Sequence, residues 1–221
     1  SWGLNYPDLR GERLTSRQGR NRGGILVTPG KYSVTMAQRV DGKTTVLQGP
    51  QEFNVVAVYD GALPRKSYDE MNDFRKDIIA LQQDLTATNT ELSKALSRIS
   101  AMMRAADKAE NRSDELFEKL ETARKSLLAI DKAMNGDDVK DEIGERSNPT
   151  PNDANRLGWV AFGNTYGPTG NHKGAYERAK KQLVGLKGKL ANMLNTTIPA
   201  MEKELERIGA PWVEGQGLIK D

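Results

Sequence analysis

The chain holds a single histidine and no cysteine, so few of its side chains could act as nucleophile, general base or metal ligand. His172 lies between Asn171 and Lys173, without a neighbouring carboxylate pair. Catalytic triads and zinc sites need further groups of these types. The sequence therefore predicts that His172 is a surface or capping residue. It also predicts a segment with no catalytic residue, no metal site and no cofactor.

Paired carboxylates are the remaining candidates for acid–base chemistry. They occur as Asp137-Asp138, Asp141-Glu142 and Glu204 with Glu206. General acid–base catalysis needs two such groups in a cleft with different pKa values. These pairs lie among mixed charges, which favours solvated faces. Weak calcium binding by residues 137–145 stays open as an alternative because hard oxygen ligands suit calcium, although the full spacing of an EF-hand is absent.

Aromatic residues form the first candidate interaction surface. They are Trp159, Phe162 and Tyr166, within one segment rich in glycine, and Trp212 near the C-terminal end. Exposed, these rings would offer a stacking surface to a sugar or a partner protein. Buried, they would hold the segment onto the rest of the fold. The interleaved Gly158, Gly163 and Gly167 favour burial.

A second candidate surface is a segment of arginine and glycine. Its arginines are Arg10, Arg13, Arg17, Arg20 and Arg22. Such a loop can contact phosphates. However, no aromatic platform or nucleic-acid-binding motif accompanies it, and the formal net charge is only +3. We therefore expect no nucleic-acid partner, and Arg13, Arg17, Arg20 and Arg22 remain candidates for contacts with a protein or a glycan.

Three stretches carry an apolar residue at every third or fourth position, which places each set on one helical face. The first set is Met71, Phe74, Ile78, Leu81, Leu85, Leu92, Leu96, Ile99 and Met103, interrupted by Thr88. The second is Leu116, Leu120, Ala123, Leu127, Ile130 and Met134. The third is Tyr176, Ala179, Leu183, Leu186, Leu190, Leu194, Ile198, Met201, Leu205 and Ile208. Three such faces predict an antiparallel three-helix bundle over residues 67–221.

Cap and stop signals set the limits of these helices at about 67–109, 113–134 and 174–208. Ser67 with Glu70 is a capping box, and Gly136 and Gly209 are stop signals. Residues 135–173 form a long ordered loop, in which 139–143 and 154–161 could be short helices. Pro199 falls inside the third helix, and we expect a kink because its ring clashes with the carbonyl of Asn195.

The first 60 residues predict a small antiparallel β unit of the sandwich type, joined to the bundle by a linker at 61–66. Tyr32, Val34 and Met36 alternate on one side of a strand, and Asp41-Gly42 is a tight-turn signal. Further strands are expected at 44–47 and 53–58, with a short alternating run at 2–6. The unit is too small to be stable without a neighbour. The predicted fold class is α+β, mainly α.

No run of about 18 apolar residues occurs, so we expect no membrane span. The chain begins with Ser1 and Trp2, inside an alternating segment and without an initiator methionine. No charged and apolar leader opens it. We interpret it as a piece of a longer protein or a processed product.

Several short motifs resemble one family. They are Trp2-Gly3-Leu4-Asn5-Tyr6-Pro7, Thr28-Pro29-Gly30-Lys31-Tyr32-Ser33-Val34, Asn155-Arg156-Leu157-Gly158, Asn164-Thr165-Tyr166-Gly167-Pro168-Thr169, Tyr176, Ile198-Pro199-Ala200 and Gly209-Ala210-Pro211-Trp212. Together they resemble the C-terminal region of large bacterial sortilin-like proteins, often labelled glycosyl hydrolases with Asp-box, or neuraminidase-type, repeats. In that family a β-propeller precedes a small β unit and a helical region. The Asp-box pattern itself is absent from this chain.

The resemblance implies a non-catalytic C-terminal accessory region of a secreted or periplasmic bacterial protein, and no catalytic residue is carried over. It would pack on the N-terminal β-propeller of the same parent protein or on a partner chain. A first alternative is that it completes a glycan- or peptide-binding or processing site, through Trp159, Tyr166 or the Arg13 to Arg22 loop. A second is a helical adaptor that acts alone by coiled-coil pairing.

Overall fold

The computed structural model describes residues 2–7, 24–58, 66–145, 149, 151, 153–163 and 166–217. In this part of the chain one two-stranded antiparallel sheet is followed by helices. The α+β, mainly α prediction is confirmed. The chain divides into two compact units, Ser1–Ile79 with Gly158–Thr169, and Ala80–Leu157 with Gly170–Asp221. Each is described by itself.

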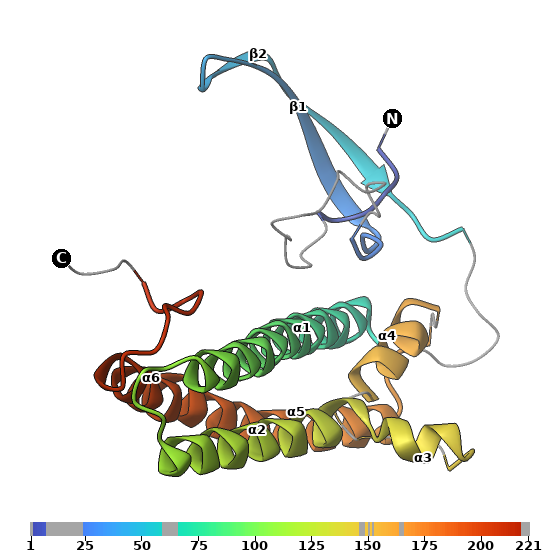
Figure 1. The fold of residues 1–221 in the computed structure, drawn as a ribbon. Helices are drawn as coiled ribbons and strands as arrows, with labels where there is room; N and C mark the ends of the chain where they lie inside the picture. Colours follow the sequence, from blue (N-terminus) through green and yellow to red (C-terminus); the bar gives the residue numbers. More distant parts are fainter. Residues whose placement is uncertain are drawn as a thin grey trace. The chain divides into compact units, whose positions relative to one another are not determined.

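The sheet is a long hairpin of β1 (Gly30–Val40) and β2 (Lys43–Val55), visible in Figure 1. Asp41 and Gly42 both have positive φ, 50° and 78°, as a two-residue hairpin turn of matching twist requires. Tyr32 pairs with Phe53, and Val40 pairs with Lys43. A short segment before the hairpin contributes only an isolated bridge.

The prediction of a sandwich is wrong in the number of sheets and strands, because the described residues hold one sheet of two strands. Residues 44–47 and 53–58 were expected to be separate strands, but β2 runs through all of the first and ends at Val55 within the second. The ladder shifts between Val34 and Ala37, opposite Leu47 and the Gly49-Pro50 pair. Bulges of this kind interrupt the alternation of apolar residues along a strand. They also accept a proline, which has no N–H to donate to the ladder. For both reasons the sequence pattern of one bulged strand resembles that of two shorter strands.

The second compact unit, the helical unit, is a bundle of long helices (Figure 1), although residues 68–79 and 158–163 of these helices belong to the first unit. Its elements are α1 (Tyr68–Asp107), α2 (Asp114–Asn135), α3 (Asp138–Glu142), α4 (Asp153–Gly163), α5 (Gly170–Asn192), the π-helical turn η2 (Met193–Thr197) and α6 (Ile198–Arg207). Ser67 and Ser113 accept hydrogen bonds from the backbone N–H groups of Glu70 and Leu116, at 3.1 and 3.2 Å. Both side chains therefore cap helix N-termini.

The apolar stripes form the core of the bundle. All six predicted residues of α2 are buried, with Leu127 fully inaccessible. On α1, Ala95 and Met102 are buried where Leu96 and Met103 were expected. The stripe of α1 therefore lies slightly rotated from the predicted face. Thr88, also buried, satisfies its hydroxyl by donating to the carbonyl of Asp84 at 2.7 Å.

The predicted loop 135–173 is partly helical, because it contains α3, α4 and the first turn of α5. Ala154 and Leu157 of α4 are buried, and Gln82 Nε2 donates to the carbonyl of Ala154 at 3.2 Å. Pro151 is also fully buried. These contacts attach Pro151 and residues 153–157 to the bundle, and α3 and α4 fall where short helices were expected, at 139–143 and 154–161.

The predicted kink at Pro199 takes the form of the π turn η2. Ile198 N–H bonds to the carbonyl of Met193, five residues earlier, and Pro199 lies in the first turn of α6. Met193 is buried and Leu194 only half-buried, which corrects the predicted stripe. The buried residues therefore step by five from Met193 to Ile198, as one π turn requires.

Candidate interaction surface

The structure describes only some of the predicted site residues. Arg13, Arg17, Arg20 and Arg22 lie outside the described residues. Trp159 and Phe162 belong to α4, but their side chains also lie outside the described part. Tyr166 and Trp212 are exposed by 39% and 52%. Trp212 Nε1 donates to the carbonyl of Gly217 at 3.0 Å, so its ring is held against the last described residues.

The side chains that could act as acids, bases or metal ligands lie apart from one another in the described residues. Across the described ranges, no three His, Cys, Asp or Glu side chains gather as a metal site would require. His172 lies half-buried in the first turn of α5. Asp137 is paired with Lys132, and this hydrogen bond lowers the pKa of its carboxyl group.

The two faces of β1 differ in character, although the β2 residues paired with Val34, Met36 and Val40 are the polar Gln51, Gln48 and Lys43. Because β1 alternates regularly, Tyr32, Val34, Met36 and Val40 share a face, and Phe53 pairs with Tyr32 on the same side. The opposite face carries an ion pair between Lys31 Nζ and Glu52 Oε2 at 2.6 Å. Such two-faced strands occur where one face is covered by another body.

Aromatic rings cover one end of the apolar face. The ring centroids of Trp2 lie 5.8 Å from those of Tyr32 and Phe53, which are themselves 6.0 Å apart. The hydroxyl of Tyr32 donates to the carbonyl of Thr28 at 2.7 Å, and a hydrogen bond with Tyr32 raises the pKa of Tyr6. This cluster fixes the base of the hairpin against the preceding segment.

Beyond the aromatic cluster, the apolar face is open. The exposed fractions of Val34, Met36 and Val40 are 56%, 62% and 54%. On β2, Val46 pairs with Ala37 on the opposite face and Leu47 lies in a bulge; their exposed fractions are 61% and 51%. An isolated two-stranded hairpin is marginally stable in water. A long hairpin that leaves these side chains exposed is therefore the strongest candidate for contact with another protein.

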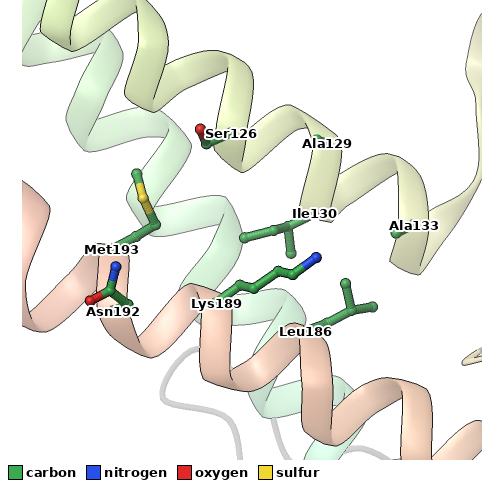
Figure 2. Close-up of a pocket in the computed structure, with 8 residues that line it drawn as sticks. All are labelled: Ser126, Ala129, Ile130, Ala133, Leu186, Lys189, Asn192 and Met193. Atoms are coloured by element: carbon green, nitrogen blue, oxygen red, sulfur yellow. The ribbon is translucent and has the colours of Figure 1, made fainter.

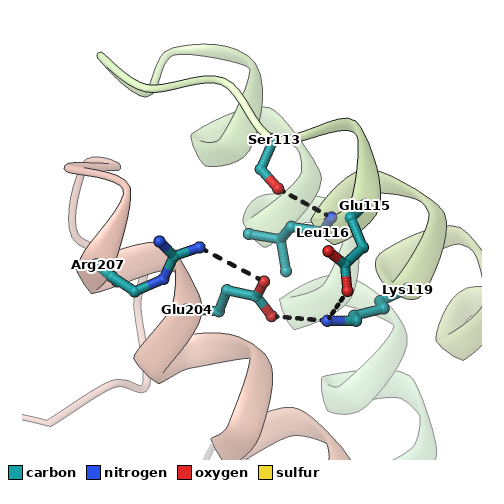
Figure 3. Close-up of polar contacts among 6 residues, drawn as sticks. All are labelled: Ser113, Glu115, Leu116, Lys119, Glu204 and Arg207. Carbon is teal, nitrogen blue, oxygen red and sulfur yellow. Dashed lines mark hydrogen bonds and ion pairs between the residues drawn. The ribbon is translucent and has the colours of Figure 1, made fainter.

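The helical unit has an ionic end, shown in Figure 3, where α2 meets α6. Lys119 Nζ lies 2.8 Å from Glu115 Oε1 and 3.3 Å from Glu204 Oε2, and Arg207 approaches Glu204 at 3.8 Å. The hydrogen bonds of Lys119 with Glu115 and then Glu204 raise the pKa of its ammonium group, and the same contact lowers the pKa of Glu115. These side chains bridge the two helices at the solvent-exposed surface of the seam between them.

Further along the same seam the side chains become small, and a groove of about 390 Å³ opens between α2 and α5. Its lining is Ser126, Ala129, Ile130, Ala133, Leu186, Lys189, Asn192 and Met193. Figure 2 shows Ile130, Leu186 and Lys189 converging between the helices. Ile130, Leu186 and Met193 are buried and form an apolar floor. The groove is thus a second candidate binding surface.

A partly buried ion pair holds the segment after α6. Arg98 of α1 pairs with Glu202, and its Nη2 donates to the carbonyl of Gly215 at 2.6 Å. The exposed fractions of these two side chains are 27% and 13%, and Val213 is buried. Arg98 therefore fixes the segment after α6 to the bundle.

Comparison with family models, curated proteins and solved structures finds no match for this chain. Among the helices that the structure describes, none combines the length and the apolar character needed to cross a membrane.

Sequence reasoning missed both open surfaces. The alternation of Tyr32, Val34 and Met36 was recognised as one side of a strand in a unit that needs a neighbour, but its open face was not identified. The groove was not recognised, although Ser126, Ala129 and Ala133 recur at helical spacing beside the buried face of α2. Small residues in such a row are the signal that could have found it.

Proposed function

We propose that this chain is a non-catalytic accessory region that docks onto another protein body through the apolar face of its β hairpin. The body that the resemblance suggests is the N-terminal β-propeller of the same parent protein, in the bacterial periplasm or outside the cell. The observation that carries the proposal is the exposure of Val34, Met36 and Val40 along one face.

Docking would remove the exposed apolar side chains of the hairpin from water. Complete burial of a valine or methionine side chain contributes about 1.5–3 kcal/mol. Because Val34, Met36 and Val40 are each a little over half exposed, covering them would add roughly 1 kcal/mol apiece. Docking would therefore add to the stability of a hairpin that is marginal on its own.

The edges of the hairpin supply a second reason. In the described sheet, β1 and β2 pair only with each other, so each has one edge free to accept a strand. The blades of a propeller are sheets, and their strands could continue the ladder or cover the apolar face. The bulges of β2 between the partners of Val34 and Ala37 increase the local twist and favour covering of the face over addition of a flat strand.

The test compares the two faces of the hairpin. Val34→Lys with Met36→Lys places charges on the apolar face, and Ser33→Lys with Thr35→Lys does the same on the polar face of the same strand. The propeller of the parent protein, produced separately, is titrated with each chain by calorimetry. We expect at least about tenfold weaker binding for the first pair, or roughly 1.4 kcal/mol, and little change for the second. Equal binding by both pairs, or no binding by the unmodified chain, would contradict the proposal.

A further inference from the structure

We propose that the groove between α2 and α5 binds an amphipathic helix of a partner protein, one whose apolar stripe is flanked by carboxylates. This inference does not rest on the hairpin, because the groove belongs entirely to the other compact unit.

The apolar floor sets the first requirement on the occupant. Ile130, Leu186 and Met193 face the groove, and its volume of about 390 Å³ exceeds that of a single side chain. Pockets of this size typically bury apolar groups and orient them by a few polar ones. Here Ser126 and Asn192 lie at the groove as the polar groups. A stripe of leucine-like side chains would fill it.

The shape of the walls favours a helix over an extended chain. In Figure 2, Ala133 lies toward the Leu186 end of the groove and Ser126 toward the Met193 end, so α2 runs antiparallel to α5 and the η2 turn that follows it. Ala129 is exposed on α2, and a side chain added to Gly185 of α5 would meet nothing within 4 Å. Small residues on both walls allow another helix to approach closely, and such a helix would complete a four-helix arrangement.

The charges of the rim select an acidic partner. Lys181, Gly185 and Lys189 follow one another at intervals of four along α5, as do Lys125, Ala129 and Ala133 along α2. Lys181 and Lys189 have no carboxylate partner among the described residues, and Lys125 reaches Glu121 only at 4.0 Å. Lys189 therefore places a positive charge at the groove itself, and Lys181 and Lys125 follow at helical spacing on its two sides. A second copy docked groove to groove would bring like charges together, so we infer a different, acidic partner.

The experiment uses the full chain and a labelled amphipathic peptide with a leucine stripe flanked by glutamates. Fluorescence anisotropy compares it with the same peptide carrying lysines in place of the glutamates. We expect binding of the first peptide, about tenfold weaker binding of the second, and a similar loss for Lys189→Glu. Lys203→Glu, an exposed lysine outside the groove lining, is the matched control and should stay within about twofold.

Two tryptophan substitutions distinguish binding in the groove from nonspecific binding to other surfaces of the chain. Ala129→Trp blocks the groove, whereas Ala87→Trp adds the same ring at an exposed alanine of α1 outside the lining. Both variants should melt as the unmodified chain does, and only Ala129→Trp should lose the peptide. Absence of peptide binding, or equal binding of both peptides, would overturn the proposal. So would binding of laurate in place of the peptide, or a dimer of this chain that Ala129→Trp dissociates.

Discussion

Two neighbouring leucines of α2 test the placement of the bundle core, because they have the same chemistry and face different ways. Leu127 is fully buried, whereas Leu128 is 41% exposed. Removing three carbons from a fully enclosed leucine costs the transfer free energy and leaves a cavity, about 2–5 kcal/mol in all. Leu128→Ala loses only part of its burial and gains slightly in helix propensity, so we expect a cost below about 1 kcal/mol.

The measurement is thermal unfolding followed by far-UV circular dichroism. For a chain of this size, 1 kcal/mol shifts the midpoint by about 2–4 °C, so Leu127→Ala should lower it by roughly 4–20 °C. Leu128→Ala should lower it by no more than about 4 °C. Equal shifts for the two variants, or a larger one for Leu128→Ala, would refute the assignment of the α2 stripe to the core.

Three further predictions concern charges and backbone. Arg98→Met leaves Glu202 without its partner and should lower the free energy of unfolding by about 3 kcal/mol. The double variant with Glu202→Leu should largely restore it. If urea unfolding shows that the losses of the two single variants add, the pairing is contradicted. Because its folded pKa is lowered, Glu115 contributes stability above its unfolded pKa and loses it as the pH falls through the folded value. Glu115→Gln should therefore flatten the acid limb of a urea-midpoint profile, and an unchanged slope would contradict this. Gly167→Ala should destabilise by at least about 1 kcal/mol, since φ is +100° and its Cβ would lie 2.7 Å from Lys66 Cβ, whereas Gly170→Ala meets no atom and should not.

The helices of this protein were predictable because their signals are local. Stripes at intervals of three and four, Ser113 before α2 and Gly136 after it are all readable within one or two turns. The sequence signal for the hairpin turn, Asp41-Gly42, was equally local. Sheet width was not predictable in this way, since it depends on which strands pair, and bulges at Leu47 and Gly49 disguised one strand as two.

The surfaces were less predictable because exposure is a property of the whole fold. An alternating strand such as 32–36 has the same pattern whether its apolar face is covered or open. Likewise, the small residues Ala129 and Ala133 indicate a groove only when it is known that α5 lies beside them and leaves the space between the helices open. The sequence can therefore name apolar and small faces, but only the arrangement of elements shows which of them remain available to a partner.

The π turn links the backbone chemistry of Pro199 to the groove. A proline cannot donate to the carbonyl four residues earlier, so a regular α-helix through this point would lose a hydrogen bond and clash. Widening the turn to a five-residue step bonds Ile198 N–H to the carbonyl of Met193 instead. The same step keeps both Met193 and Ile198 on the buried side, which four-residue spacing would not. Met193 thereby forms one end of the groove floor, and the position of the groove follows from how the helix accommodates a single proline.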